Sequence, residues 1–316
     1  MAGRHRKTVI VAGPTASGKS ALAVRIAEEF GGVVINADSM QIYDGLPILS
    51  AQPDAAQQAR APHRLYGALA PDDPCSVGRW LDMAAAEARS AWNQDRLPVV
   101  TGGTGLYLQA LQDGLAPVPD IPAPVRAETR RMLAEIGNER FHAMLAARDP
   151  VMGARLHPSN SQRLARAWEV IEASGRSLAD WQQEPAQGRL DGDILPILLL
   201  PAPAILYAAC DERFLAMTAE GAQEEARAFR TRALDPALPV MKTLGLAELI
   251  AHAEGRLDLD QAVMMAQGAT RRYAKRQRTW FRHRLPARHI AYEQFSERLS
   301  DEIFSIIRQF LLTGIF

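Results

Sequence analysis

The sequence predicts a mixed α/β protein with one parallel sheet, an all-helical insertion and further helices at its C-terminal end. Three observations lead to this prediction. Short runs rich in β-branched residues alternate with amphipathic helical patterns, as parallel strands joined by helices require. A glycine-rich loop follows the first of these runs. Proline-rich segments then enclose a stretch that has helical patterns but no strand signal.

The first half of the chain carries the strand and helix signals of a sheet domain. The expected strands are 8–12, 33–36 and 98–101, and the expected helices between them are 21–30 and 77–94. Each strand run is short, apolar and followed by small or polar residues, which is typical of strands buried on both faces of a parallel sheet.

The second half changes character after Leu111. A proline-rich segment, 114–124, leads into helical patterns at 125–145 and 149–181, and a second patch rich in proline and glycine, 184–192, ends them. A strand is expected at 194–200, followed by helices at 211–234, 242–254, 259–284 and 297–312. We therefore predict a sheet domain from 1–114, a helical insertion from 115–190, and completion of the core with C-terminal helices from 191–316.

Bulk composition limits the class of protein without naming it. The chain has 316 residues, more than one ordinary domain, and its 47% hydrophobic content is that of a globular protein. Lys plus Arg equals Asp plus Glu at 36 each, so any surface for nucleic acid has to be local. The two cysteines, Cys75 and Cys210, fit neither a disulfide framework nor a zinc site. We expect a cytoplasmic protein.

No targeting or membrane segment is expected. The apolar run 8–12 stops at Gly13 and Pro14, far short of a signal-peptide core. The longer apolar run 194–206 contains three prolines, which a membrane-spanning helix of about 20 residues would hardly tolerate.

The glycine-rich loop satisfies the pattern G-x-x-x-x-G-K-[ST] and lies between an expected strand and an expected helix. Its residues are Gly13, Pro14, Thr15, Ala16, Ser17, Gly18, Lys19 and Ser20. Backbone N–H groups of such a loop converge on phosphate oxygens, Lys19 adds a charge, and Ser20 can ligate Mg²⁺. A diphosphate on any carrier would fit, whether a nucleotide such as ATP or an isoprenoid. A chance glycine turn before a helix is the alternative.

The residues after the other strands do not favour an ATPase. A nucleotide hydrolase needs an acidic residue at the end of a neighbouring buried strand, to hold metal and water. Asp38 follows the second strand, but the third is followed by Gly102, Gly103, Thr104 and Gly105, without a carboxylate.

A strongly basic segment lies in the helix expected at 259–284. Between 271 and 284 there is no acidic residue, and the cations are Arg271, Arg272, Lys275, Arg276, Arg278, Arg282 and Arg284. Such a density of charge suits a phosphate backbone. A solvated helical face is the bland alternative.

Five segments resemble the signatures of the tRNA dimethylallyltransferase family, also called the tRNA isopentenyltransferase or IPP transferase family. They are 35–48, 62–65, 102–107, 161–170 and 273–282, in the family's order. Two segments depart from it: Gln52 stands where the family commonly has lysine, and Gly245 is followed by Leu246 and Ala247 rather than by tyrosine and a basic residue.

The resemblance implies a P-loop NTPase-like core with a helical insertion, and a prenyl transfer. Enzymes of this family move the dimethylallyl group of dimethylallyl diphosphate to N6 of adenosine 37, directly 3′ of the anticodon, in tRNAs that read codons beginning with U. Diphosphate is released with the assistance of Mg²⁺. The implied partners are tRNA, through its anticodon stem-loop, and the prenyl donor. Nothing requires more than a monomer.

The resemblance also gives candidate roles to single residues. Asp38 would accept a proton from the adenine amine, with a helix N-cap or a metal-linked carboxylate as alternatives. Thr104 would lie close to the base, unless it is a turn threonine bonded to its own backbone. Arg213 would bind the diphosphate, unless it is an ordinary solvated charge.

The expected tRNA contacts come from the matching segments and from the basic helix. They are Asp38, Ser39, Met40, Gln41, Arg126, Gln162, Arg163, Leu164, Ala165, Arg166, Arg276 and Arg278. Without the resemblance, 162–166 is merely the basic start of a helix.

Two other functions stay open at this point. A small-molecule P-loop kinase would share the loop and the Mg²⁺ but would not need a long cationic helix. A non-catalytic RNA-binding module would not need Lys19 and Ser20 beside Asp38.

Overall fold

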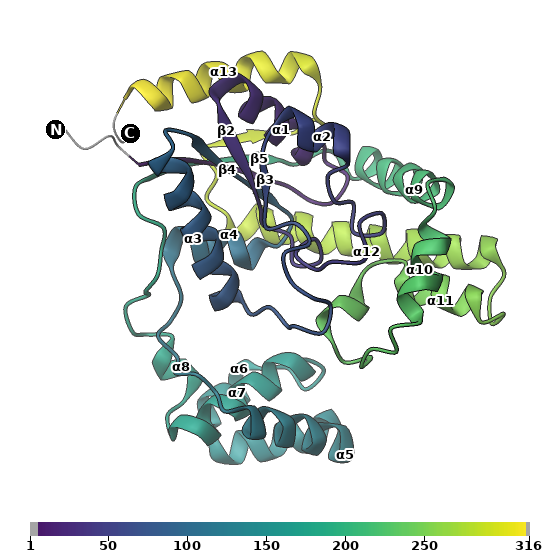
Figure 1. Ribbon diagram of the computed structural model, residues 1–316. Coiled ribbons are helices and arrows are strands. Elements are labelled where there is room, and N and C mark those ends of the chain that lie inside the picture. Colours follow the sequence, from purple (N-terminus) through teal and green to yellow (C-terminus); the bar gives the residue numbers. More distant parts are fainter. Residues whose placement is uncertain (1–5, 314–316) are drawn as a thin grey trace. The chain divides into compact units, whose positions relative to one another are not determined.

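A computed structural model of the chain describes residues 6–313 and contains one parallel sheet (Figure 1). The strand order is β3-β2-β4-β1-β5-β6, and every neighbouring pair is parallel. The strands are β1 (Lys7–Ala12), β2 (Gly32–Asn36), β3 (His63–Arg64), β4 (Leu97–Gly102), β5 (Asp193–Leu199) and β6 (His289–Ala291). The predicted α/β class with a parallel sheet is confirmed.

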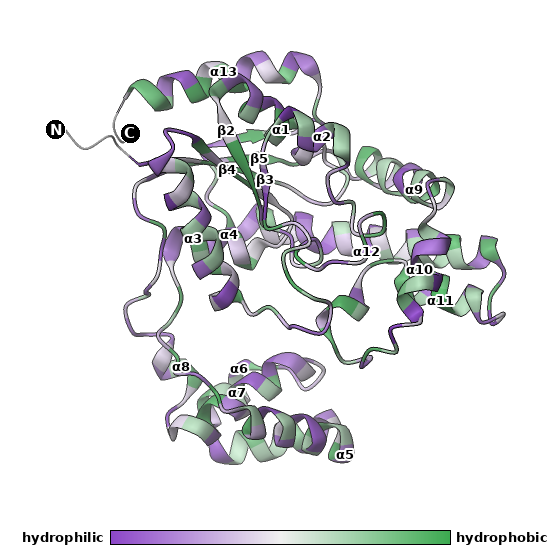
Figure 2. Cartoon of the chain, viewed as in Figure 1, coloured by the Kyte–Doolittle hydropathy of each residue, from purple (hydrophilic) through white to green (hydrophobic). Residues whose placement is uncertain are grey.

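Buried apolar residues explain why the central strands form. Every residue of β1, β2 and β4 is buried, and most of these residues are apolar. The green colour of β2 and β4 in Figure 2 shows this hydrophobic character. Strands in this position are covered by helices on both faces, so they need no alternation of polar and apolar side chains.

Helices cover both faces of the sheet (Figure 1). On one face α1 (Lys19–Phe30) and α13 (Glu297–Leu312) pack on β1, β4 and β5 in a single apolar cluster. On the other face lie α3 (Val77–Asn93) and α4 (Gly105–Asp113), and α3 buries an apolar stripe that begins at Trp80. These two layers hold the strand ends in fixed positions.

The helices that follow the sheet differ in part from the prediction. They are α9 (Pro203–Ala219), α10 (Ala222–Arg230), the 3₁₀ turn η1 (Pro239–Lys242), α11 (Leu246–Ala253) and α12 (Leu259–Arg284). The single helix expected at 211–234 is wrong: α9 begins earlier, because proline suits a first helical turn, and Gly221 at φ +106° separates it from α10. The ends predicted for α12 and α13 are confirmed.

Four short elements were not expected: α2 (Ala55–Arg60), β3, α4 and β6. β3 has two residues and β6 has three, and each is defined by pairing with an edge of the sheet rather than by its own sequence. Within residues 6–313 no helix combines the length and the apolar character needed to cross a bilayer.

Residues Asp113–Arg189 form a compact unit of their own. Its helices are α5 (Ala123–Arg148), α6 (Pro150–Arg155), α7 (Ser161–Ser174) and α8 (Leu178–Trp181), and α5 is interrupted at Gly137. Its core is formed by Phe141, Leu145, Met152, Leu164, Ala167, Trp168 and Ala179. The two ends of the unit are joined by paired backbone bonds of 2.8 Å between Leu115 and Gln187.

Candidate active site

The register of the sheet brings three loops to one edge. Ala12 of β1 pairs with Gly102 of β4, and Asn36 of β2 pairs with Thr101. The glycine-rich loop, Asp38 and Thr104 follow these positions, so all three start from the carboxyl ends of adjacent strands. This edge is where ligands bind in open α/β sheets.

The phosphate loop, residues 13–20, has the geometry of an anion-binding turn. Gly18 at φ +85° precedes the first residue of α1, and no side chain caps that helix end. The free N–H groups of α1 and its positive dipole end therefore face the loop. The Lys19 ammonium folds back over the loop and donates to the Pro14 carbonyl at 3.3 Å. Within residues 6–313 the buried Ser17 hydroxyl has no hydrogen-bond partner.

Two cations lie at this loop. Burial lowers the pKa of Lys19 to about 8, although the negative charge of Asp38 acts in the opposite direction. Arg213, on α9, donates a hydrogen bond to the Thr15 hydroxyl. Burial also lowers the pKa of Arg213, with Asp38 again opposing the shift. The positive charges of Lys19 and Arg213 therefore lie at the same loop, where they would attract a bound anion.

Asp38 is held by a small polar network. Its backbone N–H donates to Asn36 Oδ1 at 2.7 Å, and its Oδ1 accepts from the Met40 N–H at 3.0 Å. Asn36 is fully buried and is itself fixed by a bond of 2.9 Å from Nδ2 to the Leu65 carbonyl. Turns rather than a helix follow Asp38, so the alternative of a helix N-cap is wrong. Within residues 6–313 the bond from Met40 is the one found to this carboxylate, and it leaves Oδ2 available.

Three tyrosines close enough to feel the charge of Asp38 are neutral phenols. Burial raises the pKa of Tyr66, Tyr107 and Tyr273 well above its usual range, and the charge of Asp38 adds to this effect in each case. Hydrogen bonds with Thr104 and Gln277 act in the opposite direction on Tyr273. As neutral phenols these side chains can donate hydrogen bonds.

Thr104 lies beside Asp38 and is bonded to the loop that carries it. Its Oγ1 accepts from the Ser39 N–H at 2.9 Å and donates to the Ser39 hydroxyl at 3.2 Å. Its N–H donates to the Ala37 carbonyl at 3.2 Å. A Cβ on Gly102 would lie 2.1 Å from the Ala37 carbonyl oxygen, so only glycine permits this approach. The hydroxyl is thus bonded across the site, not to its own backbone.

A cavity of about 690 Å³ opens from the phosphate loop. Its charged and polar lining includes Lys19, Ser20 and Arg213 at the phosphate loop, and also the acidic residues Asp54, Glu212 and Glu220. Apolar groups of the wall come from Val24, Val34, Pro47, Ile48, Ala51, Ala216 and Met217. A molecule with a charged head and a short hydrocarbon tail would match this lining.

Glu225, on α10, fixes one wall of this cavity. Its carboxylate accepts from the N–H groups of Ile48 and Leu49, each at 2.8 Å. Gln52 also lies in the lining, and its Nε2 donates to the Tyr43 carbonyl at 2.8 Å. His63 lines the cavity as well, and burial lowers its pKa.

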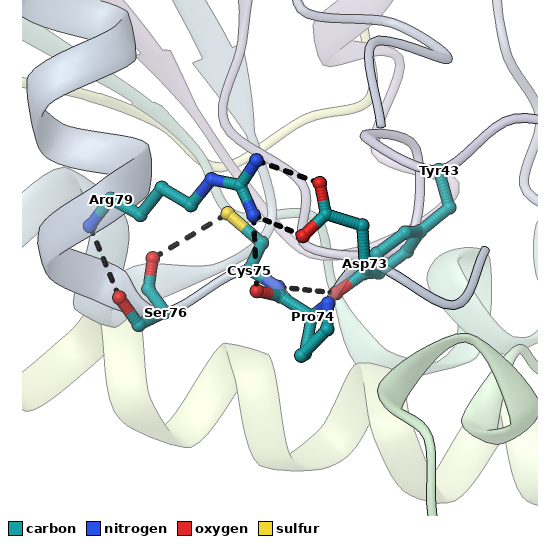
Figure 3. A network of polar contacts seen from close by, with 6 residues as sticks. All are labelled: Tyr43, Asp73, Pro74, Cys75, Ser76 and Arg79. Atoms are coloured by element: carbon teal, nitrogen blue, oxygen red, sulfur yellow. Dashed lines mark hydrogen bonds and ion pairs between the residues drawn. The ribbon is translucent and has the colours of Figure 1, made fainter. Parts of the chain in front are cut away.

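A polar network braces the loop before α3 (Figure 3). The Tyr43 hydroxyl accepts from the Cys75 N–H at 2.9 Å, Arg79 is paired with Asp73, and the Ser76 hydroxyl caps α3 by accepting from the Arg79 N–H at 3.1 Å. Next to Cys75, the Tyr107 ring stacks on Trp80 with centroids 4.4 Å apart. The stacking on Trp80 fixes the ring of Tyr107, one of the three tyrosines described above.

Gln277 is the principal residue that the sequence analysis missed. It lies on α12, is 6% exposed, and bonds both to the phosphate loop and to the turn before Thr104. Its position in the buried stripe of α12 was a usable signal. That stripe is Ala262, Ala266, Thr270, Ala274, Gln277 and Phe281, and a glutamine in such a row is buried and has to be bonded.

Some of the cations of the basic helix α12 are exposed, and others are bonded to neighbouring residues. Arg272, Lys275, Arg276, Arg282 and Arg284 are exposed. Arg276 also lies over the Tyr273 ring, 5.6 Å from its centroid. Arg271 is paired with Asp211, and Arg278 donates to the Pro201 carbonyl at 3.2 Å. Arg278 therefore has a structural bond besides the RNA contact expected of it.

The other expected tRNA contacts are placed in two different units. In the sheet unit, Ser39, Met40 and Gln41 are partly exposed, and the Gln41 amide donates to the carbonyls of Ser50 and Ala51. In the unit 113–189, Arg126, Gln162 and Arg163 are exposed, whereas Ala165 and Arg166 are partly buried. Leu164 needs a correction: its side chain is fully buried in the core of that unit and offers no surface to RNA.

Comparisons with known proteins agree with this geometry. The family model described as IPP transferase matches residues 41–284, and one described as isopentenyl transferase matches residues 6–68. The chain is 56% identical over 306 residues to a protein of Paramagnetospirillum magneticum named tRNA dimethylallyltransferase, with 97% of each chain covered. A protein of the same name from Rhodospirillum rubrum is 50% identical over 97% of this chain and 95% of its own.

A solved structure is also similar along the whole chain. The full-length tRNA isopentenylpyrophosphate transferase of Bacillus halodurans is 29% identical, covers 97% of both chains and superposes with a TM-score of 0.70. These matches do not favour the alternative of a small-molecule kinase, and they confirm the resemblance found in the five sequence segments. The chain belongs to the IPP transferase family.

Proposed function

We propose that this chain transfers the dimethylallyl group of dimethylallyl diphosphate to N6 of adenosine 37 in tRNAs that read codons beginning with U. One observation carries the proposal: the carboxylate of Asp38 lies at the same sheet edge as the phosphate loop, where Lys19 and Arg213 also lie. A base and a clamp for a departing anion are the two things that this transfer needs.

The donor would occupy the cavity beside the phosphate loop. Its diphosphate would accept hydrogen bonds from the loop N–H groups, Lys19 and Arg213. Its hydrocarbon tail would lie against apolar residues such as Ile48 and Met217. Because the cations are fixed before the reaction, they stabilise the negative charge that grows on the leaving group without reorganising.

The chemical step would form one bond and break another. The N6 lone pair of adenine attacks the allylic carbon, the carbon–oxygen bond to the diphosphate breaks, and its electron pair leaves with the diphosphate. The amine is a poor nucleophile because its lone pair is delocalised into the ring, so loss of its proton to Asp38 assists the attack. Thr104, bonded to Ser39 beside Asp38, would orient the base.

The residues of the loop fit a Mg²⁺ ion bound together with the diphosphate. Ser20 is exposed at the start of α1 and lines the cavity, and a hydroxyl oxygen is a hard ligand of the kind that Mg²⁺ prefers. Within residues 6–313 no group of three His, Cys, Asp or Glu side chains could hold a metal, so Ser20 would share the ion with diphosphate oxygens and water. The ion would neutralise charge on the leaving group.

The tRNA would be held by the exposed cations of α12, and by Arg126, Gln162 and Arg163 of the insertion unit. The target adenosine has to leave the anticodon stack to reach Asp38, at a cost of a few kcal/mol. Because the target lies in a single-stranded loop, this cost is lower than in a duplex. Binding of ATP to the loop, a monomeric state and a cytoplasmic location stay predictions.

A labelled-donor experiment tests the proposal. Radiolabelled dimethylallyl diphosphate and Mg²⁺ are incubated with the chain and an unmodified anticodon stem-loop that has adenosine 37, or guanosine at that position as a control. We expect label in the first RNA alone, because guanosine has no N6 amine. Absence of label from both RNAs, or equal label in both, would contradict the proposal.

A further inference from the structure

The side chain of Gln277 joins the two halves of the site. From α12, its Oε1 accepts a hydrogen bond from the Thr15 N–H in the phosphate loop at 2.8 Å. Its Nε2 donates to the Gly103 carbonyl, directly before Thr104, also at 2.8 Å. One carboxamide thus bonds the loop after β1 to the turn after β4.

Two glycines permit α12 to come this close. A Cβ on Gly103 would lie 2.2 Å from Gln277 Nε2, and 3.5 Å from Asp38 Oδ2. A Cβ on Gly105 would lie 2.3 Å from Cε3 of Trp280, one turn further along α12. At Gly103 and Gly105 there is therefore no room for a side chain, and α12 packs directly on the backbone of these two residues.

The two bonds of Gln277 also fix the orientation of its amide. The N–H of Thr15 requires the oxygen and the carbonyl of Gly103 requires the nitrogen, so the carboxamide has one satisfactory orientation. Thr15 is held from its other side by Arg213, through its hydroxyl. Replacement of Gln277 by an apolar residue would leave a buried donor and a buried acceptor unpaired, and both loops would be free to shift.

We propose that Gln277 is a positioning residue for the transfer, which sets the distance between the loop that holds the donor diphosphate and the turn that borders Asp38 and carries Thr104. This inference rests on the proposed function. A displacement of about 1 Å between reacting groups can lower a rate by about 10²-fold. The exposed cations that would bind RNA also lie on α12. RNA would therefore contact the same helix whose Gln277 sets this distance.

Two substitutions at this position and one matched control test the proposal. Gln277→Ala removes both bonds, and Gln277→Glu keeps the acceptor for Thr15 but sets a carboxylate against the Gly103 carbonyl. The control, Gln267→Ala, removes a glutamine bond of 3.1 Å from the same helix to the Asp211 carbonyl, away from the phosphate loop. Single-turnover transfer at saturating donor and RNA is measured together with both dissociation constants and thermal unfolding.

We expect Gln277→Ala to lower the single-turnover rate by about 10²-fold, while both dissociation constants change by no more than about threefold. Gln267→Ala should transfer at the wild-type rate. A residue that merely stabilises the fold would change unfolding and not the rate of the folded enzyme. A rate of Gln277→Ala within about threefold of wild type would overturn the proposal.

The pH dependence of Gln277→Glu gives a second readout. A protonated carboxyl can donate to Gly103 and accept from Thr15, so the rate relative to wild type should rise as the pH falls. The ionisable groups of the neighbouring elements are Tyr273 on α12, Asp38 after β2, and Lys19 and Arg213, which bond to the phosphate loop at Pro14 and Thr15. If the rate of Gln277→Glu relative to wild type did not change with pH, the bonds to Thr15 and Gly103 would not set the rate. Absence of transfer by the wild-type chain would overturn the proposed function and this inference with it.

Discussion

The guanidinium of Arg213 donates a hydrogen bond to the hydroxyl of Thr15. The two residues are far apart in the sequence, one on α9 and the other in the loop after β1. Their contact directs a cation to the place where the loop N–H groups and Lys19 also lie. The loop is thereby prepared to receive more negative charge than its lysine alone could balance.

Replacement of Arg213 by glutamine should reduce transfer more strongly than donor binding. The charge on the diphosphate grows as the carbon–oxygen bond breaks, and loss of one fixed donor at such a site lowers kcat by about 10²- to 10³-fold. Steady-state kinetics with tRNA and varied donor measure this effect. Arg227→Gln, at an exposed position on α10, should leave the kinetics unchanged. A kcat of Arg213→Gln equal to wild type would exclude the leaving-group role.

Asp38→Asn should nearly abolish transfer while the local fold is retained. The asparagine oxygen can still accept from the Met40 N–H, as Asp38 Oδ1 does at 3.0 Å, but the amide cannot take up a proton. We expect a fall of about 10²- to 10⁴-fold in the single-turnover rate, with tRNA affinity unchanged. Rapid-quench measurements at saturating substrates give this rate. Wild-type activity of the variant would remove Asp38 as the base.

Donor binding should weaken as the pH rises through about 8, because burial lowers the pKa of Lys19 to about 8. Below this pH the amine is charged and attracts the diphosphate; above it the free enzyme has lost that charge. The dissociation constant should then rise by up to about tenfold per pH unit, until the pKa of Lys19 in the complex is reached. Titration calorimetry across this range measures it. Lys19→Met should bind the donor more weakly than wild type, and its affinity for the donor should not fall as the pH passes through about 8.

Without donor, the lowered pKa of Lys19 should make the free protein more stable, not less, as the pH rises. The folded chain releases the Lys19 proton at lower pH than the unfolded chain, whose lysine has the ordinary pKa of 10.5. The unfolded state therefore binds more protons between these values, and this group makes the fold more stable as the pH rises from about 8. Urea unfolding of wild type and Lys19→Met, compared across this range, isolates the contribution.

The fold was predictable where the sequence pattern is local. The buried strands near 8–12, 33–36 and 98–101 show as short apolar runs, and α12 begins where Asp258 and Gln261 form a capping box. The two-residue strand β3 has no such pattern, because its pairing with Val34 and Ile35 exists only after the chain has folded. The start of α9 was missed: the helix was expected to begin at 211, although Pro203 fits a first helical turn.

Part of the site was also predictable, because some of its residues belong to local sequence patterns. The phosphate loop is a contiguous motif, and Asp38 and Thr104 follow strand ends that a parallel sheet brings together. Gln277 belongs to no contiguous motif and does not follow a strand end. It lies in the middle of a helix, and its partners are more than 170 residues away in the sequence. Only the packing of α12 on Gly103 and Gly105 makes it part of the site. The burial of Leu164 likewise depends on the core of its unit.

Lys7 should contribute to stability rather than to activity. The residue is 9% exposed, and its ammonium donates to the carbonyls of Phe310, Leu311 and Thr313 at the end of α13. A charged donor that satisfies the last carbonyls of a helix is worth about 1–3 kcal/mol. Lys7→Met should lower the free energy of unfolding by this amount, measured by urea denaturation. The control Arg6→Gln, which removes an exposed ion pair with Asp191, should change it by less than about 1 kcal/mol.

The exposed cations of α12 should make tRNA binding dependent on salt. Arg276→Gln removes one such charge, so the slope of log K against log salt concentration should fall by about 1. Filter binding at several salt concentrations measures the slope. Arg256→Gln, at an exposed arginine paired with Glu254, serves as the control and should leave the slope unchanged. Equal slopes for wild type and Arg276→Gln would show that Arg276 does not contact the phosphate backbone.

The stoichiometry of transfer tests the central claim most directly. The diphosphate clamp and the base at Asp38 together require that each prenyl group transferred releases one diphosphate, and that no nucleotide is consumed. Diphosphate release and prenylated adenosine are therefore counted in the same reaction, with tRNA, dimethylallyl diphosphate and Mg²⁺ but without ATP. Equal amounts of the two products are the predicted result. Diphosphate released without modified adenosine, or transfer that requires ATP, would contradict the account.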